Sequence, residues 1–163
     1  VAGILETWIR QGYETGPLGY PVSNETPTPT GGSYNAFQHG AVYWSPATGA
    51  HWLTGPVFDA WAAQGREGGP LGYPAGDLGR LPGGGSFAWF QGGAVYASPA
   101  TGAHVLSGPI LHAWIAQGFE TGPLGYPTSD PHPVPGGTAV DFQGGTLTVD
   151  ATGTVTSSRS VTR

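Results

Sequence analysis

The sequence predicts an α+β repeat protein of three similar units, each a helix, a tight turn and a β-hairpin. The hexapeptide Gly-Pro-Leu-Gly-Tyr-Pro occurs at 16–21, 69–74 and 122–127, a constant step of 53 residues. Each copy lies between a helix-like and a strand-like apolar pattern, and both patterns keep the same step. A period of this size is the signature of a repeat architecture. We therefore expect a single domain with units at 1–53, 54–106 and 107–157 and a tail at 158–163.

The first element of each unit is a short amphipathic helix. Ile4, Leu5, Trp8 and Ile9 fall on one helical face, and the pattern recurs in the second and third units. Proline occupies the first turn of the later two helices, where it is tolerated, and a glycine follows each helix as a cap. Helices of about two to three turns need tertiary packing to persist. The recurring tryptophans of these faces are predicted core residues: Trp8, Trp61 and Trp114.

The repeated hexapeptide predicts a compact turn, because its two glycines and two prolines prevent regular structure. Its leucine is expected to fill the core of each unit: Leu18, Leu71 and Leu124. A variable polar loop follows, and a Phe-Gln-x-Gly segment then leads into the hairpin. In the first hairpin, residues 41–44 and 50–53 form the strands around a turn at 45–49. Alternation places Val42 on one side of the sheet and Tyr43 on the other.

The third hairpin is degenerate. The segment 146–156 matches the other copies only if two single-residue deletions are allowed, and Thr148 and Val155 replace the Tyr and His of the earlier hairpins. A terminal repeat often departs from the pattern because it caps the array. Three whole units favour a compact pseudo-threefold arrangement, and an open arc is the alternative.

Composition excludes several kinds of partner. Only 9% of the 163 residues are charged, the formal net charge is −5, and the five Arg are scattered. No basic patch for nucleic acid can be built from them. The chain has no Cys, no signal peptide in view and no apolar run that would place it in a membrane, so we expect an excised domain or a processed product. A weakly charged, aromatic and amide-rich surface suits a neutral ligand such as polysaccharide.

The recurring motifs resemble the LGFP repeat family. The resemblance rests on the repeated Gly-Pro-Leu-Gly-Tyr-Pro, the upstream Trp-x-x-x-Gly, and the downstream Phe-Gln-x-Gly and Ser-Pro-Ala-Thr-Gly-Ala-His, and it extends from Gly3 to about Val155. It implies a secreted envelope module of mycolic-acid-containing actinobacteria or their phages. Family members are attached to mycolyltransferases, amidases and other hydrolases such as endolysins, and the implied ligand is cell-wall arabinogalactan. The family supplies no catalytic residues to carry over.

Four aromatic residues are the candidate sugar-stacking groups, because sugars present C–H faces that stack on aromatic rings. Tyr43 and Tyr96 occupy the strand phase opposite the valines, and Trp89 should point away from Phe90. The fourth is Trp44. Packing at the sheet surface or between repeats is the alternative for all four.

Recurring amides and carboxylates are the candidate hydrogen-bonding groups. An amide offers donors and an acceptor for sugar hydroxyls, which applies to Gln38, Gln91 and Gln143. The alternative is an amide that holds the loop backbone. The recurring carboxylates could contact sugar, and we favour a role in capping N–H groups of the tight turn: Glu14, Glu67 and Glu120.

The histidines and the remaining polar residues do not predict catalysis. His51 and His104 recur without a third copy, so a hydrogen bond to the adjacent turn is expected first and a sugar contact second. One such His per unit and no Cys argue against a metal site. Ser45, His51 and Asp59 lack the setting of a nucleophile elbow, and the repeated Glu residues are not paired as a glycosidase requires. The sequence thus predicts a non-enzymatic protein with no cofactor.

Overall fold

The computed structural model describes residues 2–159, and each unit holds one α-helix and one antiparallel sheet. The helices are α1 (Ala2–Arg10), α2 (Gly55–Ala63) and α3 (Gly108–Ala116). A single turn of 3₁₀ helix follows each of them, at Tyr13–Thr15, Arg66–Gly68 and Phe119–Thr121, and another 3₁₀ turn lies at Pro82–Gly84. The α+β class and the repeated order of elements agree with the sequence prediction.

Each sheet has four strands in consecutive order, and so is larger than the predicted hairpin. The first consists of β1 (Thr26–Pro27), β2 (Ser33–Phe37), β3 (Gly40–Ser45) and β4 (Gly49–Thr54). The second consists of β5 (Gly79–Leu81), β6 (Gly85–Phe90), β7 (Gly93–Ser98) and β8 (Gly102–Leu106). The third consists of β9 (His132–Val134), β10 (Gly137–Phe142), β11 (Gly145–Asp150) and β12 (Val155–Arg159). The predicted hairpin corresponds to the last two strands. The polar loop supplies the first strand, and the residues between the loop and the Phe-Gln-x-Gly turn supply the second.

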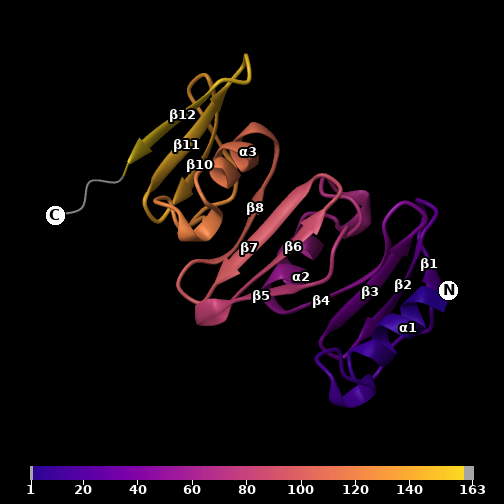
Figure 1. Ribbon diagram of the computed structural model, residues 1–163. Coiled ribbons are helices and arrows are strands. Elements are labelled where there is room, and N and C mark those ends of the chain that lie inside the picture. The colour runs from indigo at the N-terminus through magenta and orange to yellow at the C-terminus, as the bar shows by residue number, and fades with distance from the viewer. Residues whose placement is uncertain (1, 160–163) are drawn as a thin grey trace.

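Helices and sheets alternate along one row, with α1 and β12 at opposite ends of the row (Figure 1). Helix α1 contacts β3 and β4, α2 contacts strands of both the first and the second sheet, and α3 contacts β7, β11 and β12. The described units are therefore in the open arrangement that the sequence left as the alternative, and no compact threefold arrangement is seen among them. Because α2 and α3 each pack against two sheets, the buried apolar residues form two clusters, one across the first junction and one across the second.

The two faces of the first and second sheets contact different helices. In the first sheet, Phe37 stacks on Trp8 of α1 with ring centroids 6.0 Å apart. Tyr43, on the opposite face, meets the edge of Trp61 of α2 at 4.7 Å. The second sheet repeats this arrangement, since Phe90 stacks on Trp61 and Tyr96 meets Trp114 of α3. An inner face thus packs on the unit's own helix, and an outer face on the helix of the next unit.

Glycine permits the abrupt end of each helix. Gly12, Gly65 and Gly118 have φ of 104°, 105° and 105°, a left-handed conformation that glycine adopts without cost. The chain then folds back so closely that a Cβ on Gly16 would lie 1.8 Å from the carbonyl oxygen of Gln11. The predicted caps are confirmed. The three leucines of the turn are buried as predicted, with exposed fractions of 0%, 2% and 3% for Leu18, Leu71 and Leu124.

The outer face of the third sheet differs from the other two. Its central row is Ala139, Thr148 and Thr156, where the first sheet has Tyr34, Tyr43 and His51. Thr156 is exposed, and no helix among the described residues covers this face. Ala139 is buried and Thr148 half-buried, so this face has no aromatic row for a following helix to cover. The degenerate hairpin therefore ends the row as a cap.

Candidate functional site

Two equivalent hollows lie where one unit meets the next. The first junction groove has a volume of about 290 Å³, and the second about 220 Å³. In each, the Phe-Gln-x-Gly turn of one sheet faces the start of the next unit's helix. The first is lined by Tyr34, Ala36, Phe37, Gln38, His39, Gly40, Ala41, Phe58, Asp59 and Arg66. The second is lined by Trp89, Phe90, Gln91, Gly92, Gly93, Gly108, Leu111 and His112.

A glutamine lines each junction groove, and its side-chain oxygen already accepts a hydrogen bond from the protein backbone. The Oε1 atom of Gln38 accepts a hydrogen bond from the backbone N–H of Tyr20 over 2.9 Å, and Gln91 does the same for Tyr73. Gln143 repeats the bond to Tyr126 over 3.0 Å. The alternative of an amide that holds the turn backbone is therefore observed in all three units. Within residues 2–159 no hydrogen bond from their Nε2 groups is found, so these exposed donors remain open to a ligand.

The polar side chains beside the glutamine differ between the two grooves. Asp59 and Arg66 line the first, and His112 lines the second. The guanidinium of Arg66 lies over the ring of Phe58, 5.8 Å from its centroid, and donates to the Tyr43 hydroxyl over 3.2 Å. Sequence reasoning missed Asp59, Arg66 and His112 as lining residues. Asp59 and His112 share one helical position at the 53-residue step, and this shared position was the signal available.

A third, wider groove of about 410 Å³ also spans the first junction. It lies between the Ser-Pro-Ala turn of the first unit and the hexapeptide turn of the second. Its lining residues are Thr30, Ser45, Pro46, Ala47, Glu67, Tyr73 and Gln91. Two of the predicted ligand contacts, Glu67 and Gln91, are thus brought together here.

Tyr43 and Tyr96 are not surface platforms, which corrects the sequence-based expectation. Their exposed fractions are 1% and 3%. Tyr43 stacks on Tyr34 and meets the edge of Trp61, and Tyr96 repeats both contacts with Phe87 and Trp114. The alternation rule identified the correct face of the sheet, but the next helix covers that face. Inter-repeat packing, the stated alternative, is their role.

The two tryptophan candidates are half-buried. Trp44 packs against the core of the first unit beside Gly3. Trp89 lines the second junction groove and meets the edge of Tyr96 at 6.5 Å. Trp89 is therefore the predicted aromatic residue that borders a groove.

The three recurring glutamates do not cap the turn, contrary to the favoured expectation. In the described part of the chain, no hydrogen bond joins the carboxylate of Glu14, Glu67 or Glu120 to a backbone N–H group of the hexapeptide turn. Burial raises the pKa of Tyr96 to about 12, and the Glu120 carboxylate adds to this shift. Burial also raises the pKa of Tyr43, to which Glu67 contributes. Glu67 and Glu120 therefore each lie near the buried tyrosine of one junction.

The histidines connect neighbouring units. Nε2 of His51 is 2.7 Å from the Thr48 carbonyl oxygen, and Nδ1 is 2.9 Å from a carboxylate oxygen of Asp77 in the next unit's loop. His104 repeats this arrangement with Thr101 and with Asp130, the latter at 3.3 Å. The predicted hydrogen bond to the turn is confirmed, whereas the bond to the following unit was not foreseen. The third unit has Val155 instead of His, and it lies at the capped end.

The His51–Asp77 pair predicts a pH dependence of stability. The hydrogen bond to Asp77 raises the pKa of His51 above 6.5, because both ring nitrogens face acceptors and the imidazolium can donate to both. Partial burial alone would raise the pKa of Asp77, but the bonds from His51 and the Trp52 N–H lower it below 3.8. The stabilisation that His51 contributes is fully present below the pKa of His51 in the unfolded chain, and it is lost as pH rises through the raised pKa of the folded state. The stabilisation that Asp77 contributes is present at higher pH, and it is lost as pH falls through the lowered pKa of Asp77 in the folded state.

The pair should therefore stabilise the protein most between about pH 4 and 6.5. We expect the free energy of unfolding to fall by roughly 0.5 kcal/mol on going from pH 6 to pH 8, a small loss because the pair is partly exposed. Urea denaturation at both pH values measures it, with Asp77→Asn as the control that should remove this part of the pH dependence. An unchanged pH dependence in Asp77→Asn would contradict the assignment.

Ser45 and His51, two members of the Ser-His-Asp set considered from the sequence, are each bonded to other partners. The Ser45 hydroxyl is buried and bonds to Thr48 Oγ1 at 2.5 Å, while His51 bonds to Asp77. No group of three His, Cys, Asp or Glu side chains could hold a metal ion in the described residues. In the same part of the chain, every helix is too short or too polar to cross a membrane.

The alternating helices and sheets, with equivalent grooves at successive junctions, define a tandem repeat module. The chain belongs to the LGFP repeat family: the family model matches residues 18–69 and 71–122, which is more than half of it. LGFP repeats are non-catalytic modules. Each matched segment runs from the turn leucine through a sheet to the next helix, and therefore includes a complete junction. No curated protein matches the chain.

Proposed function

We propose that this protein is a non-catalytic, extracellular cell-wall-binding module that recognises an envelope polysaccharide, the arabinogalactan of mycolic-acid-containing actinobacteria. The observation that carries the proposal is the pair of equivalent junction grooves, each with an open glutamine donor. A repeating polymer can present similar sugar units to both grooves. Family membership and the low charge of the chain support a neutral wall ligand.

Binding at one groove would be weak, and two grooves on one polymer strengthen it. A sugar held in the first groove raises the effective concentration of the next sugar at the second. Such a module would anchor or target an attached enzyme, such as a mycolyltransferase, an amidase or a phage endolysin. The module supplies attachment, and the attached domain supplies the chemistry.

A role as a structural or protein-assembly domain of the envelope is the second candidate. One observation favours it: large apolar side chains are exposed at the α1 end of the row, including Leu5 at 57% and Ile9 at 37%. Exposed apolar patches mark protein–protein interaction sites, and aliphatic side chains offer no flat ring on which a sugar can stack. In this case the partner would be a protein of the envelope.

Retention of the purified protein on purified arabinogalactan tests the first proposal. Mycolate-free peptidoglycan and an unrelated glucan serve as parallel matrices. We expect selective retention on arabinogalactan, and undiminished binding to walls stripped of protein. Absence of retention on every glycan, with binding only to walls that keep their proteins, would favour the assembly role.

A further inference from the structure

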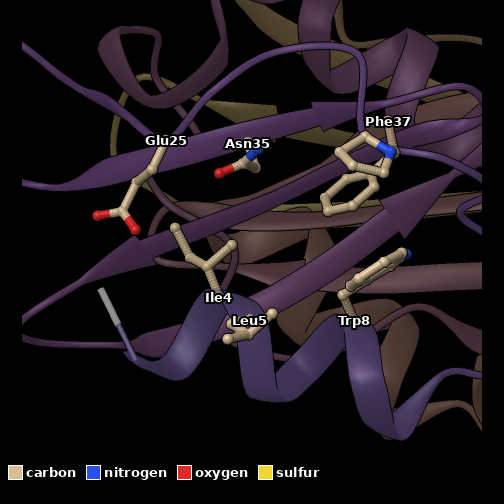
Figure 2. A pocket seen from close by; sticks show the side chains of 7 residues that line it. Ile4, Leu5, Trp8, Glu25, Asn35 and Phe37 are labelled. Carbon is tan, nitrogen blue, oxygen red and sulfur yellow. The ribbon is translucent and has the colours of Figure 1, made fainter. Parts of the chain in front are cut away.

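The outer side of α1 carries an unpartnered apolar face. All large apolar side chains that are strongly exposed in residues 2–159 belong to the first unit, and four of them share this end of the row. Their exposed fractions are 57% for Leu5, 37% for Ile9, 49% for Tyr13 and 58% for Tyr20. Figure 2 shows the hollow beside this face, a cavity of about 150 Å³ that Leu5 borders together with Ile4 and Trp8, which point toward the sheet.

The same helical positions are covered in the later units. Leu5 corresponds to Phe58, which is half-buried, and to Leu111, which is 4% exposed. Trp8 is half-buried, whereas Trp61 and Trp114 are fully buried. The difference has one cause. Helices α2 and α3 each lie against the outer face of a preceding sheet, and α1 has no such sheet among the described residues.

Tyr20 shows the same contrast more sharply. Its counterpart Tyr73 is 5% exposed and shares its hydroxyl with Thr28 and Thr30 of the preceding unit, at 2.5 and 2.6 Å. Tyr126 places its hydroxyl against Gly85 of the unit before it. Each of these hydroxyls thus lies against the loop of the preceding sheet, while Tyr20 is exposed.

The side chains of this α1 face indicate which kind of partner can cover it. The observed junctions pair this helix face with a sheet row of two aromatic rings and a histidine, such as Phe87, Tyr96 and His104. A second copy of this chain offers no free face of that kind, because α2 and α3 cover two of its sheets and the third presents Thr148 and Thr156. Sugar is a poor match, since Leu5 and Ile9 are aliphatic and have no flat ring to stack.

We propose that the outer face of α1 is a docking surface for the aromatic outer face of another LGFP-type sheet, attached ahead of α1 as β4 is attached to α2. The bound sheet would cover Leu5 and Ile9 and receive the Tyr20 side chain in its loop. The inference rests on the two junctions already formed in the molecule and does not depend on any glycan.

A four-unit chain tests the proposal. A copy of residues 54–106 is placed directly ahead of residue 1 of the full chain, which keeps the 53-residue step. Tyrosine acetylation by N-acetylimidazole, followed by mass spectrometry, then reports the accessibility of Tyr13 and Tyr20. We expect both to react severalfold more slowly than in the three-unit chain, with Tyr20 approaching the low reactivity of Tyr73.

Two substitutions, made in both chains, control the experiment. Leu5→Glu should leave the stability of the three-unit chain unchanged, and in the four-unit chain it should lower stability and restore Tyr20 acetylation. Val22→Thr should be neutral in both, because the corresponding Ala75 and Thr128 are exposed at the junctions. Unchanged acetylation in the four-unit chain, or an appended unit that stays unfolded, would overturn the proposal. Protection of Tyr13 and Tyr20 by added arabinogalactan in the three-unit chain would also overturn it and make the face a sugar site.

Discussion

Replacing Trp61 with alanine should lower the free energy of unfolding by about 3–5 kcal/mol, the usual cost of removing a large buried aromatic residue. Trp61 is 0% exposed and lies between two sheets. It meets Tyr43 edge-on at 4.7 Å, stacks on Phe90 at 5.6 Å, and donates through Nε1 to the Gly72 carbonyl over 2.9 Å. The substitution therefore opens a cavity in two units at once.

Trp8→Ala is the matched control for this prediction. Trp8 makes the corresponding bond to the Gly19 carbonyl over 3.0 Å and stacks on Phe37, but within residues 2–159 no preceding sheet contacts it. Because the ring is half-buried, we expect a smaller loss of about 1–2 kcal/mol. Urea denaturation followed by far-ultraviolet circular dichroism measures both, and Trp61→Phe provides an intermediate variant that keeps the fold. Equal losses for Trp8 and Trp61 would show that junction packing adds nothing.

Local features of the fold could be predicted from the sequence. The helices, the capping glycines and the buried leucines follow from periodicity and from backbone restrictions that act within a few residues. The hydrogen bond between His51 and the Thr48 carbonyl, three residues away, belongs to the same class. The first two strands of each sheet were missed. The short strands β1, β5 and β9 pair through the return of a polar loop, which carries no apolar alternation, and β2, β6 and β10 lead into the Phe-Gln-x-Gly turn outside the predicted hairpin.

The junctions could not be predicted from such local signals. Alternation placed Tyr43 on the face opposite Val42, but it does not say whether water, sugar or a helix covers that face. The answer comes from Trp61, eighteen residues further along the chain. The His51–Asp77 bond joins residues twenty-six positions apart in different units. Strand phase alone therefore selected the tyrosines wrongly as ligand candidates. The grooves form between consecutive units, and the sequence gives the order of these units but not how they pack.

The recurring glutamines allow a sugar-binding role to be distinguished from a role in holding the hexapeptide turn. Gln38, Gln91 and Gln143 each accept one N–H of the hexapeptide turn at nearly the same distance. Replacing any of them with alanine should thus cost a similar amount of stability, about 1 kcal/mol. Only Gln38 and Gln91 line a junction groove, because the third unit is followed by no helix among the described residues. The three positions thus share one structural role and differ in their access to a groove.

Replacing Gln38 and Gln91 together should weaken binding to immobilised arabinogalactan by about 100-fold, since the loss of both sites also removes the gain from effective concentration. Either single substitution should weaken binding severalfold, and Gln143→Ala should leave it unchanged. Binding isotherms measured beside urea denaturation curves separate the two effects. If Gln143→Ala weakened binding as much as Gln38→Ala, the glutamines would act through the turn they hold, and the junction grooves would not be the sugar sites. A loss confined to Gln38 and Gln91 at equal stability can arise only at the grooves, because that is where the three positions differ.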